Sequence, residues 1–314
     1  MQLDRRHAQA FAMLGIVMVL WAGNSIVARA VRHDVAPFTL AFLRWAGASL
    51  VVAPFAIRPL VRDWPAILRG WKPLLLLGVL GIGTFNALLY SGLQHTTATN
   101  ALLLQAATPA VMVFLDRVLF GVRARGWQTV GVAASMLGVL VIVFRGDASA
   151  AFSLRFGLGD ALILVSVFVW SLYTVFLRLR PEISPTSFIA VTFFIGVAMM
   201  APLAAWEWQA GARIEWRAPI VAAVLYVALL PSLFSYFIYN HATAIVGPAQ
   251  AGQAITLMPL FGAFLSAALL GERLHSFHFV GMALILAGIA LSLVSTRAQE
   301  PAGAAAGRSL EDRA

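Results

Sequence analysis

Runs of about twenty apolar residues, separated by short polar stretches, recur along almost the whole 314-residue chain. A helix needs roughly twenty apolar residues to cross the hydrocarbon layer of a membrane, where backbone without internal hydrogen bonds is not tolerated. The residue composition, 61% hydrophobic against 11% charged, agrees with lipid as the main solvent. We therefore predict an all-α membrane protein with ten transmembrane helices, at 10–29, 36–57, 73–94, 100–120, 127–144, 158–177, 187–206, 219–240, 249–270 and 277–295.

The connections between these runs are too short to hold a water-soluble domain. We divide the chain into an N-terminal segment (1–9), a first five-helix repeat (10–144), a connecting loop (145–157), a second five-helix repeat (158–295) and a tail (296–314). The tail is rich in Ala and Gly with scattered charge, which is typical of disorder. The function is therefore expected inside the membrane.

The formal net charge of +9 comes from basic residues that lie between the apolar runs. More of them fall on the side of the N-terminus than on the opposite side, so the positive-inside rule places both termini in the cytoplasm. We expect a multi-pass protein of the bacterial inner membrane, in contact with membrane lipid and not with nucleic acid. The chain has no cysteine, which excludes disulfides and thiolate metal sites.

The chain repeats itself at a spacing close to 150 residues. The matched positions are Pro109 with Pro259, Gly121 with Gly271, Gly131 with Gly281, Gly138 with Gly288, Trp21 with Trp170, and Tyr90 with Tyr239. With five helices in each half, the second half must enter the membrane from the opposite face, so the fold is two inverted repeats. Inverted repeats enclose a site near the middle of the bilayer and expose it to each side in turn, which predicts a transporter.

The same residues resemble the ten-helix EamA-type members of the drug/metabolite transporter superfamily over about residues 10–295. The resemblance rests on Trp21-Ala22-Gly23-Asn24, Arg44 within LAFLRWAG, Pro109, Gly159-Asp160, Trp170, Pro259, Gly271-Glu272-Arg273-Leu274 and the run GMALILAGI. It implies an exporter of amino acids or related small metabolites, driven by an ion gradient. The chain departs from the family pattern at Gly121-Val122-Arg123, where Gly-Glu-Arg is common, so that acidic group is absent from the first half.

Charged residues inside the predicted spans are few, and each has two interpretations. Arg44 lies seven residues after Pro37, about 10 Å into its helix, and should face the bundle interior. It could anchor a substrate carboxylate through the two-pronged guanidinium, or it could be a structural residue that holds backbone carbonyls. Asp116, beside Arg117, could couple transport to protons, or both residues could reach the membrane interface.

A pocket for amphipathic metabolites needs apolar walls and a few polar contacts. The candidate substrate-binding residues are Trp21, Asn24, Arg44, Tyr90, Gln105, Trp170, Tyr173, Tyr239 and Gln253. Trp and Tyr could instead be interfacial anchors, and Asn86, Asn240 and His241 could be hydrogen-bonding contacts between helices. Pro109 and Pro259 predict matched kinks that shape the cavity or act as hinges, and the four glycines at 131, 138, 281 and 288 predict close helix packing.

Other functions find less support in the sequence. Efflux of lipophilic cations or flipping of a lipid-linked substrate would favour deep carboxylates, which are scarce. No Gly-x-Ser-Gly, His-Glu-x-x-His or phosphate-loop motif occurs, so we predict no enzyme and no nucleotide-driven pump. We expect no metal site and no cofactor, and because a duplicated chain can enclose a pathway alone, we expect a monomer.

Overall fold

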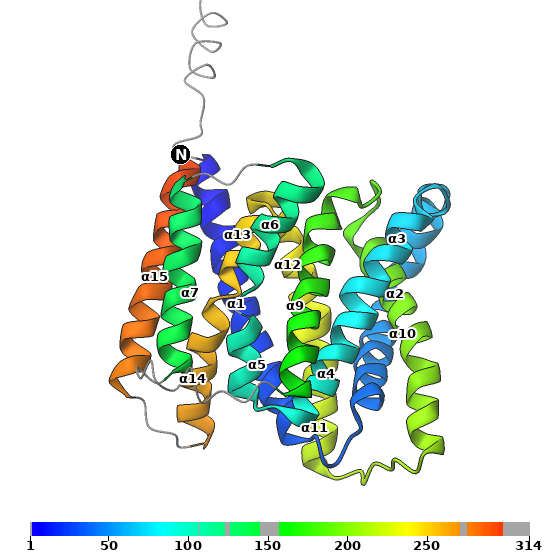
Figure 1. Cartoon of the computed structure of the whole chain (residues 1–314). Helices are drawn as coiled ribbons and strands as arrows, with labels where there is room; N and C mark the ends of the chain where they lie inside the picture. The colour runs from blue at the N-terminus through cyan, green and yellow to red at the C-terminus, as the bar shows by residue number, and fades with distance from the viewer. Residues whose placement is uncertain (1, 106, 123–125, 145–156, 271–274, 298–314) are drawn as a thin grey trace, which may run out of the picture.

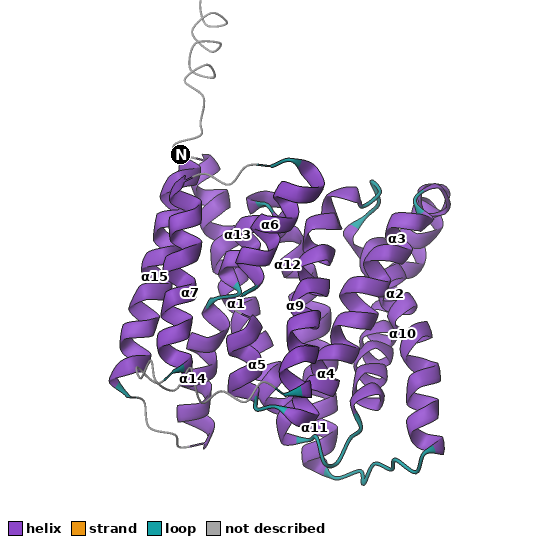
Figure 2. Ribbon diagram, viewed as in Figure 1, coloured by secondary structure: helices purple, strands orange, loops and turns teal. Residues whose placement is uncertain are grey.

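The computed structural model describes residues 2–105, 107–122, 126–144, 157–270 and 275–297, and within these ranges the chain is helical with no strand (Figure 2). Helix α1 (Gln2–Ala30) begins at the labelled N-terminus, and α15 (Ser276–Arg297) ends on the same side of the bundle (Figure 1). Nearly all of the predicted connecting loop 145–157, most of the tail 296–314, Arg123 and the 271–274 motif lie outside the described residues. The segment 1–9 is helical from Gln2 onward as part of α1.

Six helical stretches in the described ranges are long and apolar enough to cross a membrane. They are Arg5–Ala30, Pro37–Arg69, Trp71–His95, Leu158–Leu179, Pro185–Gln209 and Ala218–Val246. The chain is therefore a multi-pass membrane protein. The second stretch is the helix α2 (Pro37–Arg69), which continues well past the predicted end at 57.

The fourth and ninth predicted spans are each broken into two helices. Helix α5 (Ala98–Gln105) is followed by α6 (Thr108–Phe120), and α13 (Pro248–Ala254) is followed by α14 (Leu257–Leu270). The expected kinks at Pro109 and Pro259 are thus full interruptions. A proline has no N–H and its ring clashes with the carbonyl four residues earlier, which is Gln105 in one half and Ile255 in the other. Each helix stops at or just before that carbonyl.

The third and eighth predicted spans each contain a wide π-helical segment. Helix α3 (Trp71–Leu77) leads through η1 (Gly78–Thr84) into α4 (Phe85–His95), and α11 (Ala218–Ala228) leads through η3 (Leu229–Phe234) into α12 (Ser235–Val246). Both π segments end at positions 150 residues apart, Thr84 and Phe234. In η3 the absent N–H of Pro231 would leave the carbonyl of Val227 unpaired, and the Ser232 hydroxyl donates to it at 2.6 Å.

The two halves interlock. Helix α1 packs against α12 and α14 of the second half, and α9 (Leu158–Phe176), which continues into η2 (Leu177–Leu179), packs in the same way against α4 and α6 of the first half. Helix α2 pairs with α10 (Pro185–Gln209), and α7 (Gly126–Val143) pairs with α15 at the opposite edge of the bundle (Figure 1). The main hydrophobic core therefore contains residues of both halves.

The contact between α7 and α15 depends on matched glycines. A Cβ atom at Gly138 would meet the carbonyl oxygen of Gly281, and a Cβ atom at Gly288 would meet that of Gly131. The hydroxyl of Ser135 donates to the carbonyl of Ile285 at 3.3 Å. The close helix packing predicted from these glycines is confirmed, and each helix is the neighbour of the other.

The helices α2 and α10 run antiparallel, and a carboxylate near the end of each one caps the start of the other. At the start of α2, Glu207 accepts from the backbone N–H groups of Phe38 at 3.0 Å and Thr39 at 2.7 Å, and from the Thr39 hydroxyl at 2.7 Å. The preceding residue, Ala36, has no side chain that could do this. Glu207 is buried and satisfies the unpaired donors that every helix start presents.

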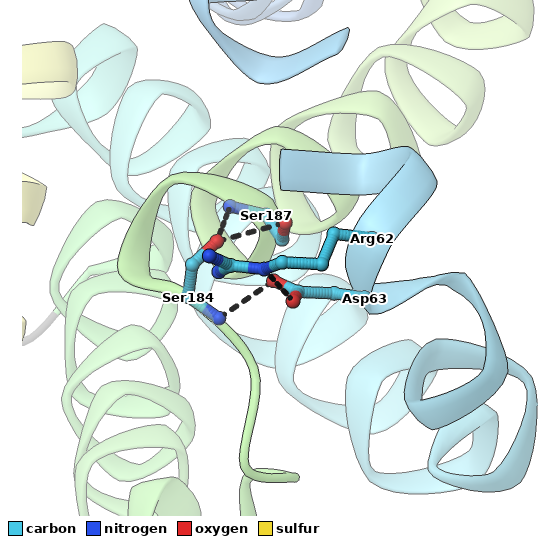
Figure 3. Close-up of polar contacts among 4 residues, drawn as sticks. All are labelled: Arg62, Asp63, Ser184 and Ser187. Carbon is cyan, nitrogen blue, oxygen red and sulfur yellow. Dashed lines mark hydrogen bonds and ion pairs between the residues drawn. The ribbon is translucent and has the colours of Figure 1, made fainter. Parts of the chain in front are cut away.

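At the other end of the pair, Asp63 caps α10. Its carboxylate accepts from the backbone N–H of Ser184 at 2.8 Å and pairs with Arg62 at 3.0 Å (Figure 3). The Ser184 hydroxyl also accepts from the N–H of Ser187 at 3.2 Å, so α10 has a cap of its own. The same device thus closes both ends of the α2–α10 pair, with one more cap at the start of α10.

Candidate functional site

Arg44 of α2 is only 2% exposed and lies in a hydrogen-bonding network in the middle of the bundle. Its Nη1 donates to three acceptors of its own half, at 3.2 Å to Asn24, 2.9 Å to Asn86 and 2.8 Å to Tyr90. The Tyr90 hydroxyl in turn donates to Asn24 at 2.9 Å. Two of the predicted site residues, Asn24 and Tyr90, are therefore direct partners of Arg44.

The other face of the Arg44 guanidinium binds the second half. Nε donates to the hydroxyl of Ser232, and Nη2 donates to the carbonyl of Pro231 at 3.0 Å. The indole nitrogen of Trp21 donates to the same carbonyl at 2.9 Å. This carbonyl is free because Pro231 lies in the π segment η3, where the N–H of Ser235 pairs with other carbonyls.

The π segment of the first half receives a matching contact. The hydroxyl of Tyr236, on α12, donates to the carbonyl of Gly81 at 2.8 Å, and Gly81 precedes Pro231 by 150 residues. Each π segment thus presents a backbone carbonyl to a side chain of the opposite half. These contacts tie the two halves together at the level of Arg44.

Every nitrogen of the Arg44 guanidinium is engaged by protein acceptors in this conformation. A substrate carboxylate would have to displace some of them in order to bind Arg44. The contacts match the structural interpretation of Arg44, and its role in binding a substrate stays a prediction.

Beside the Arg44 network, four predicted aromatic residues form one cluster. Ring centroids of Trp21 and Trp170 are 5.0 Å apart, those of Trp21 and Tyr239 4.9 Å, and those of Trp170 and Tyr173 4.9 Å. All four are buried. They come from α1, α9 and α12, so the cluster belongs to both halves. An interfacial anchoring role does not fit this central position.

A small cavity of about 10 Å³ lies between the two helix breaks. Its lining includes Trp21, Phe85, Gln105, Thr108, Val167, Trp170, Ile255 and Met258. This volume suffices for about one water molecule. The breaks before α6 and before α14 thus meet at the face of the paired tryptophans, and the cavity between them is too small for a metabolite in this conformation.

Gln253 lies apart from the other predicted site residues. Its Nε2 donates to the carbonyl of Gly288 on α15 at 2.8 Å, and the side chain is absent from the cavity lining. Gln105 does line the cavity, and its Nε2 donates to the carbonyl of Ala101 at 3.3 Å. The structure brings eight of the nine candidates into two adjoining groups and leaves Gln253 at the α13–α15 contact.

Three central residues escaped the sequence analysis. Tyr236 is buried among the rings of both halves, Trp45 lies under the Arg44 guanidinium at 4.7 Å, and Ser232 accepts from Arg44. One signal was available for Tyr236, since it lies three residues before Tyr239 and therefore on the same helix face. Ser232 gave no signal, because its importance depends on the π segment.

Asp116 is buried at the end of α6 and forms an ion pair with Arg178, which follows α9. The Arg178 guanidinium also lies 4.3 Å from the ring centroid of Phe120. Asp116 is therefore shielded by protein, whereas its neighbour Arg117 is exposed, and the choice between proton coupling and an interfacial position stays open. Within the described ranges, no group of three or more His, Asp or Glu side chains could hold a metal ion.

Comparison with known proteins gives one consistent result. The EamA-like transporter family matches this chain twice, over residues 9–144 and 157–294. An uncharacterized transporter of Archaeoglobus fulgidus is 29% identical over 91% of this chain and 98% of its own length. A probable terminal-alkyne amino-acid exporter of Streptantibioticus cattleyicolor is 27% identical, over 82% and 84% of the two chains.

Two further comparisons extend this result. A probable amino-acid metabolite efflux pump of Escherichia coli is 24% identical over 90% of this chain and 94% of its own length. A crystal structure with 18% sequence identity covers 93% of this chain and 99% of its own, with a TM-score of 0.68, which shows a shared fold. The two family matches coincide with the two halves described above, and the chain belongs to the EamA-like transporter family of membrane proteins.

Proposed function

We propose that this chain is a secondary transporter that exports amino acids or related small metabolites across the bacterial inner membrane by alternating access. The observation that carries the proposal is the small cavity of about 10 Å³ between the two helix breaks, whose lining includes the paired Trp21 and Trp170 from the two halves. No metabolite fits in that cavity, so a substrate could bind between these tryptophans only if the helices around them move apart.

The proposed architecture is ten membrane crossings in two inverted five-helix repeats. The crossings are α1, α2, α3–α4, α5–α6 and α7 in the first half, and α9, α10, α11–α12, α13–α14 and α15 in the second. The reciprocal packing of α1 and α9 supports it, since each lies against the third and fourth crossings of the other half. We place both termini in the cytoplasm from the excess of basic residues on that side, and we propose that the monomer is active.

The amino-acid substrate class is supported by the names of two relatives and by the mixed lining of the site. The central cluster offers aromatic walls, and Gln105 and Thr108 add polar contacts between them. A site of this kind suits a small molecule with one apolar part and a few hydrogen-bonding groups. The alternative substrates, lipophilic cations and lipid-linked molecules, would find no acidic group among the described residues of this lining.

The test is uptake of radiolabelled amino acids into inverted membrane vesicles that contain the protein, with and without an imposed proton gradient. We expect gradient-dependent accumulation of some amino acids, and its loss in Trp170→Ala. Trp206→Ala is the matched control. Trp206 on α10 is exposed, and its ring packs against Phe38, which does not belong to the aromatic cluster. If no amino acid accumulates although the protein is inserted, the proposed substrate class is wrong.

A further inference from the structure

A second and much larger cavity, of about 370 Å³, lies between α1, α10 and α12. It is formed by the first turns of α10, the last turns of α12 and the segment after η2, all near the end of the bundle that carries the N-terminus (Figure 1). Its volume falls in the range of small-molecule sites, whereas the central cavity holds about one water. The cavity near this end is therefore large enough for a small molecule, and the cavity between the helix breaks is not.

Most residues that line this cavity are apolar, and the polar ones are Arg180, Asn240 and His241. Its exposed residues include Arg180 and His241, and its buried residues include Phe188 and Ile189. The side chains of Arg180 and His241 form no hydrogen bond or ion pair with other described residues. None of the ten lining residues is acidic, and all of them lie in the described ranges. The cavity thus combines an unpaired cation at its mouth with an apolar interior.

Asn240 adds an unpaired donor at the inner wall. The side chain is only 5% exposed, and its Oδ1 accepts from the hydroxyl of Tyr173 at 2.9 Å. Its Nδ2 is buried and has no hydrogen-bond partner among the described residues. Leaving such a donor unpaired in a membrane protein is costly, and a ligand oxygen that entered the cavity could pair with it after a small side-chain rotation.

The cavity adjoins the central aromatic cluster through one side chain. Tyr173, the partner of Asn240, packs against Trp170 with the rings tilted by 40° and their centroids 4.9 Å apart. A molecule held between Arg180 and Asn240 would thus lie next to the aromatic cluster. Movement of Tyr173 and Trp170 is then the step that would admit it.

We propose that this cavity is the entry site for substrates at the N-terminal face, and that it selects molecules with a carboxylate and an apolar body. The inference rests on the proposed function in one respect, which is that the bound molecule is a transport substrate. Binding to the cavity does not depend on transport. Arg180 binds the carboxylate by charge-assisted hydrogen bonds, Asn240 donates to a substrate oxygen, and Phe188 and Ile189 receive the apolar part.

The absence of cysteine from the chain allows a direct test. Ala244, which lines the cavity and is exposed, is replaced by Cys in the protein held in phosphatidylcholine nanodiscs. The rate of its modification by a water-soluble maleimide is then measured with leucine, phenylalanine or 3-phenylpropionate, and with isoamylamine and phenethylamine, which lack the carboxylate. Lys72→Cys is the control, because Lys72 is exposed on α3 and lies two residues after Gly70, where an added Cβ atom would meet Pro181 at the same end of the bundle.

We expect at least one of the three carboxylates to slow the modification of Ala244→Cys, with no effect of the amines and no effect at Lys72→Cys. Adding Arg180→Gln should raise the carboxylate concentration needed to protect Ala244→Cys by about tenfold or more, because one charge-assisted interaction is lost. Since Arg180 is exposed, its replacement should leave the fold intact. An unchanged rate of modification at Lys72→Cys when Arg180→Gln is added verifies this.

Three results would overturn the inference: equal protection by the amines, protection that survives Arg180→Gln, or no protection by any carboxylate. If the modification of Ala244→Cys slows only when phosphatidylglycerol is added to the nanodiscs, the cavity binds a lipid head group and the inference is wrong. Amino-acid uptake without protection would refute this entry site alone. Protection without uptake in vesicles would refute the proposed transport and leave the binding site standing.

Discussion

The second helices of the two halves, α2 and α10, can be aligned at a spacing of 148 residues. Pro37 matches Pro185, and Pro54 matches Pro202. At this spacing the position of Arg44 corresponds to Thr192. Arg44 donates to groups of both halves, whereas the Thr192 hydroxyl donates only to carbonyls of its own helix, to Phe188 at 2.9 Å and to Ile189 at 3.1 Å.

The features that position the helices are shared by the two halves, whereas the hydrogen-bonding network of Arg44 is not repeated at Thr192. The helix breaks, the π segments, the glycine contact and the capping carboxylates occur in both halves, and they set where the helices lie. Among the described residues, the buried cation Arg44 has no counterpart in the second half. A buried charge needs several acceptors around it, and the enclosed space at the centre accommodates one such network. The repeat therefore gives both halves similar helix positions, while the buried guanidinium of the described residues belongs to the first half.

The largest effect is expected from replacing Arg44. Arg44→Leu would leave Asn24, Tyr90 and the carbonyl of Pro231 without their shared donor. We expect a loss of about 3–5 kcal/mol of stability and no transport, because breaking a buried charged network leaves its partners unsatisfied. The measurement is the apparent melting temperature of the purified protein in detergent, together with uptake into vesicles.

Arg44→Lys decides between the two interpretations of this residue. The ammonium group keeps the charge but cannot reach both halves at once, so the structural role predicts a clearly lower melting temperature. If Arg44→Lys melts at the wild-type temperature and only transport is weakened, then Arg44 anchors a substrate carboxylate and the structural role is wrong.

A smaller loss of stability is expected when the capping carboxylates Glu207 and Asp63 are replaced, and the loss should be larger at Glu207. Glu207→Ala removes the acceptor of two backbone N–H groups and one hydroxyl at the start of α2, where Ala36 offers no replacement. Asp63→Ala removes one backbone contact at the start of α10, where Ser184 still caps Ser187. We expect losses of about 2 kcal/mol at Glu207 and below about 1 kcal/mol at Asp63, measured by thermal unfolding.

The conservative variants Glu207→Gln and Asp63→Asn serve as controls, because they keep one acceptor oxygen at each cap. Each should lie between the wild type and its alanine variant. Equal losses for the two alanine variants would show that the second cap at Ser184 adds nothing, and the proposed difference between the two ends of the α2–α10 pair would be wrong.

The parts of the fold that depend on hydrophobic length and on repeated residues could be predicted from the sequence. The apolar runs predicted a multi-pass helical membrane protein, and the matched glycines predicted the close packing seen between α7 and α15. The interruptions at Pro109 and Pro259 were expected as kinks only. Whether a proline bends a helix or ends it depends on what surrounds the freed carbonyl. Here the hydroxyl of Thr108 donates to the carbonyl of Gln105, and the backbone N–H of Met258 donates to the carbonyl of Ile255 at 2.9 Å.

The sequence predicted most residues of the candidate site but not the contacts between them. Trp21, Trp170, Tyr173 and Tyr239 were found because they are aromatic residues in the spans, and all of them except Tyr173 belong to a pair matched between the halves. The partners of Arg44 in the second half could not be found in this way. The carbonyl of Pro231 is available only because η3 is wider than an α-helix, and a local sequence pattern does not predict this widening.

The smallest effect is expected at Thr192, the counterpart of Arg44. Thr192→Val removes a hydroxyl that donates to carbonyls already within the α10 helix and keeps the branched shape, so the loss should stay below about 1 kcal/mol and uptake should be unchanged. The measurement is the same melting temperature and uptake assay used for Arg44. If Thr192→Val instead abolishes transport in a protein of wild-type stability, Thr192 must act beyond its own helix. The charge at Arg44 would then have a polar partner site in the second half, and the one-sided arrangement inferred from the comparison of α2 and α10 would be wrong.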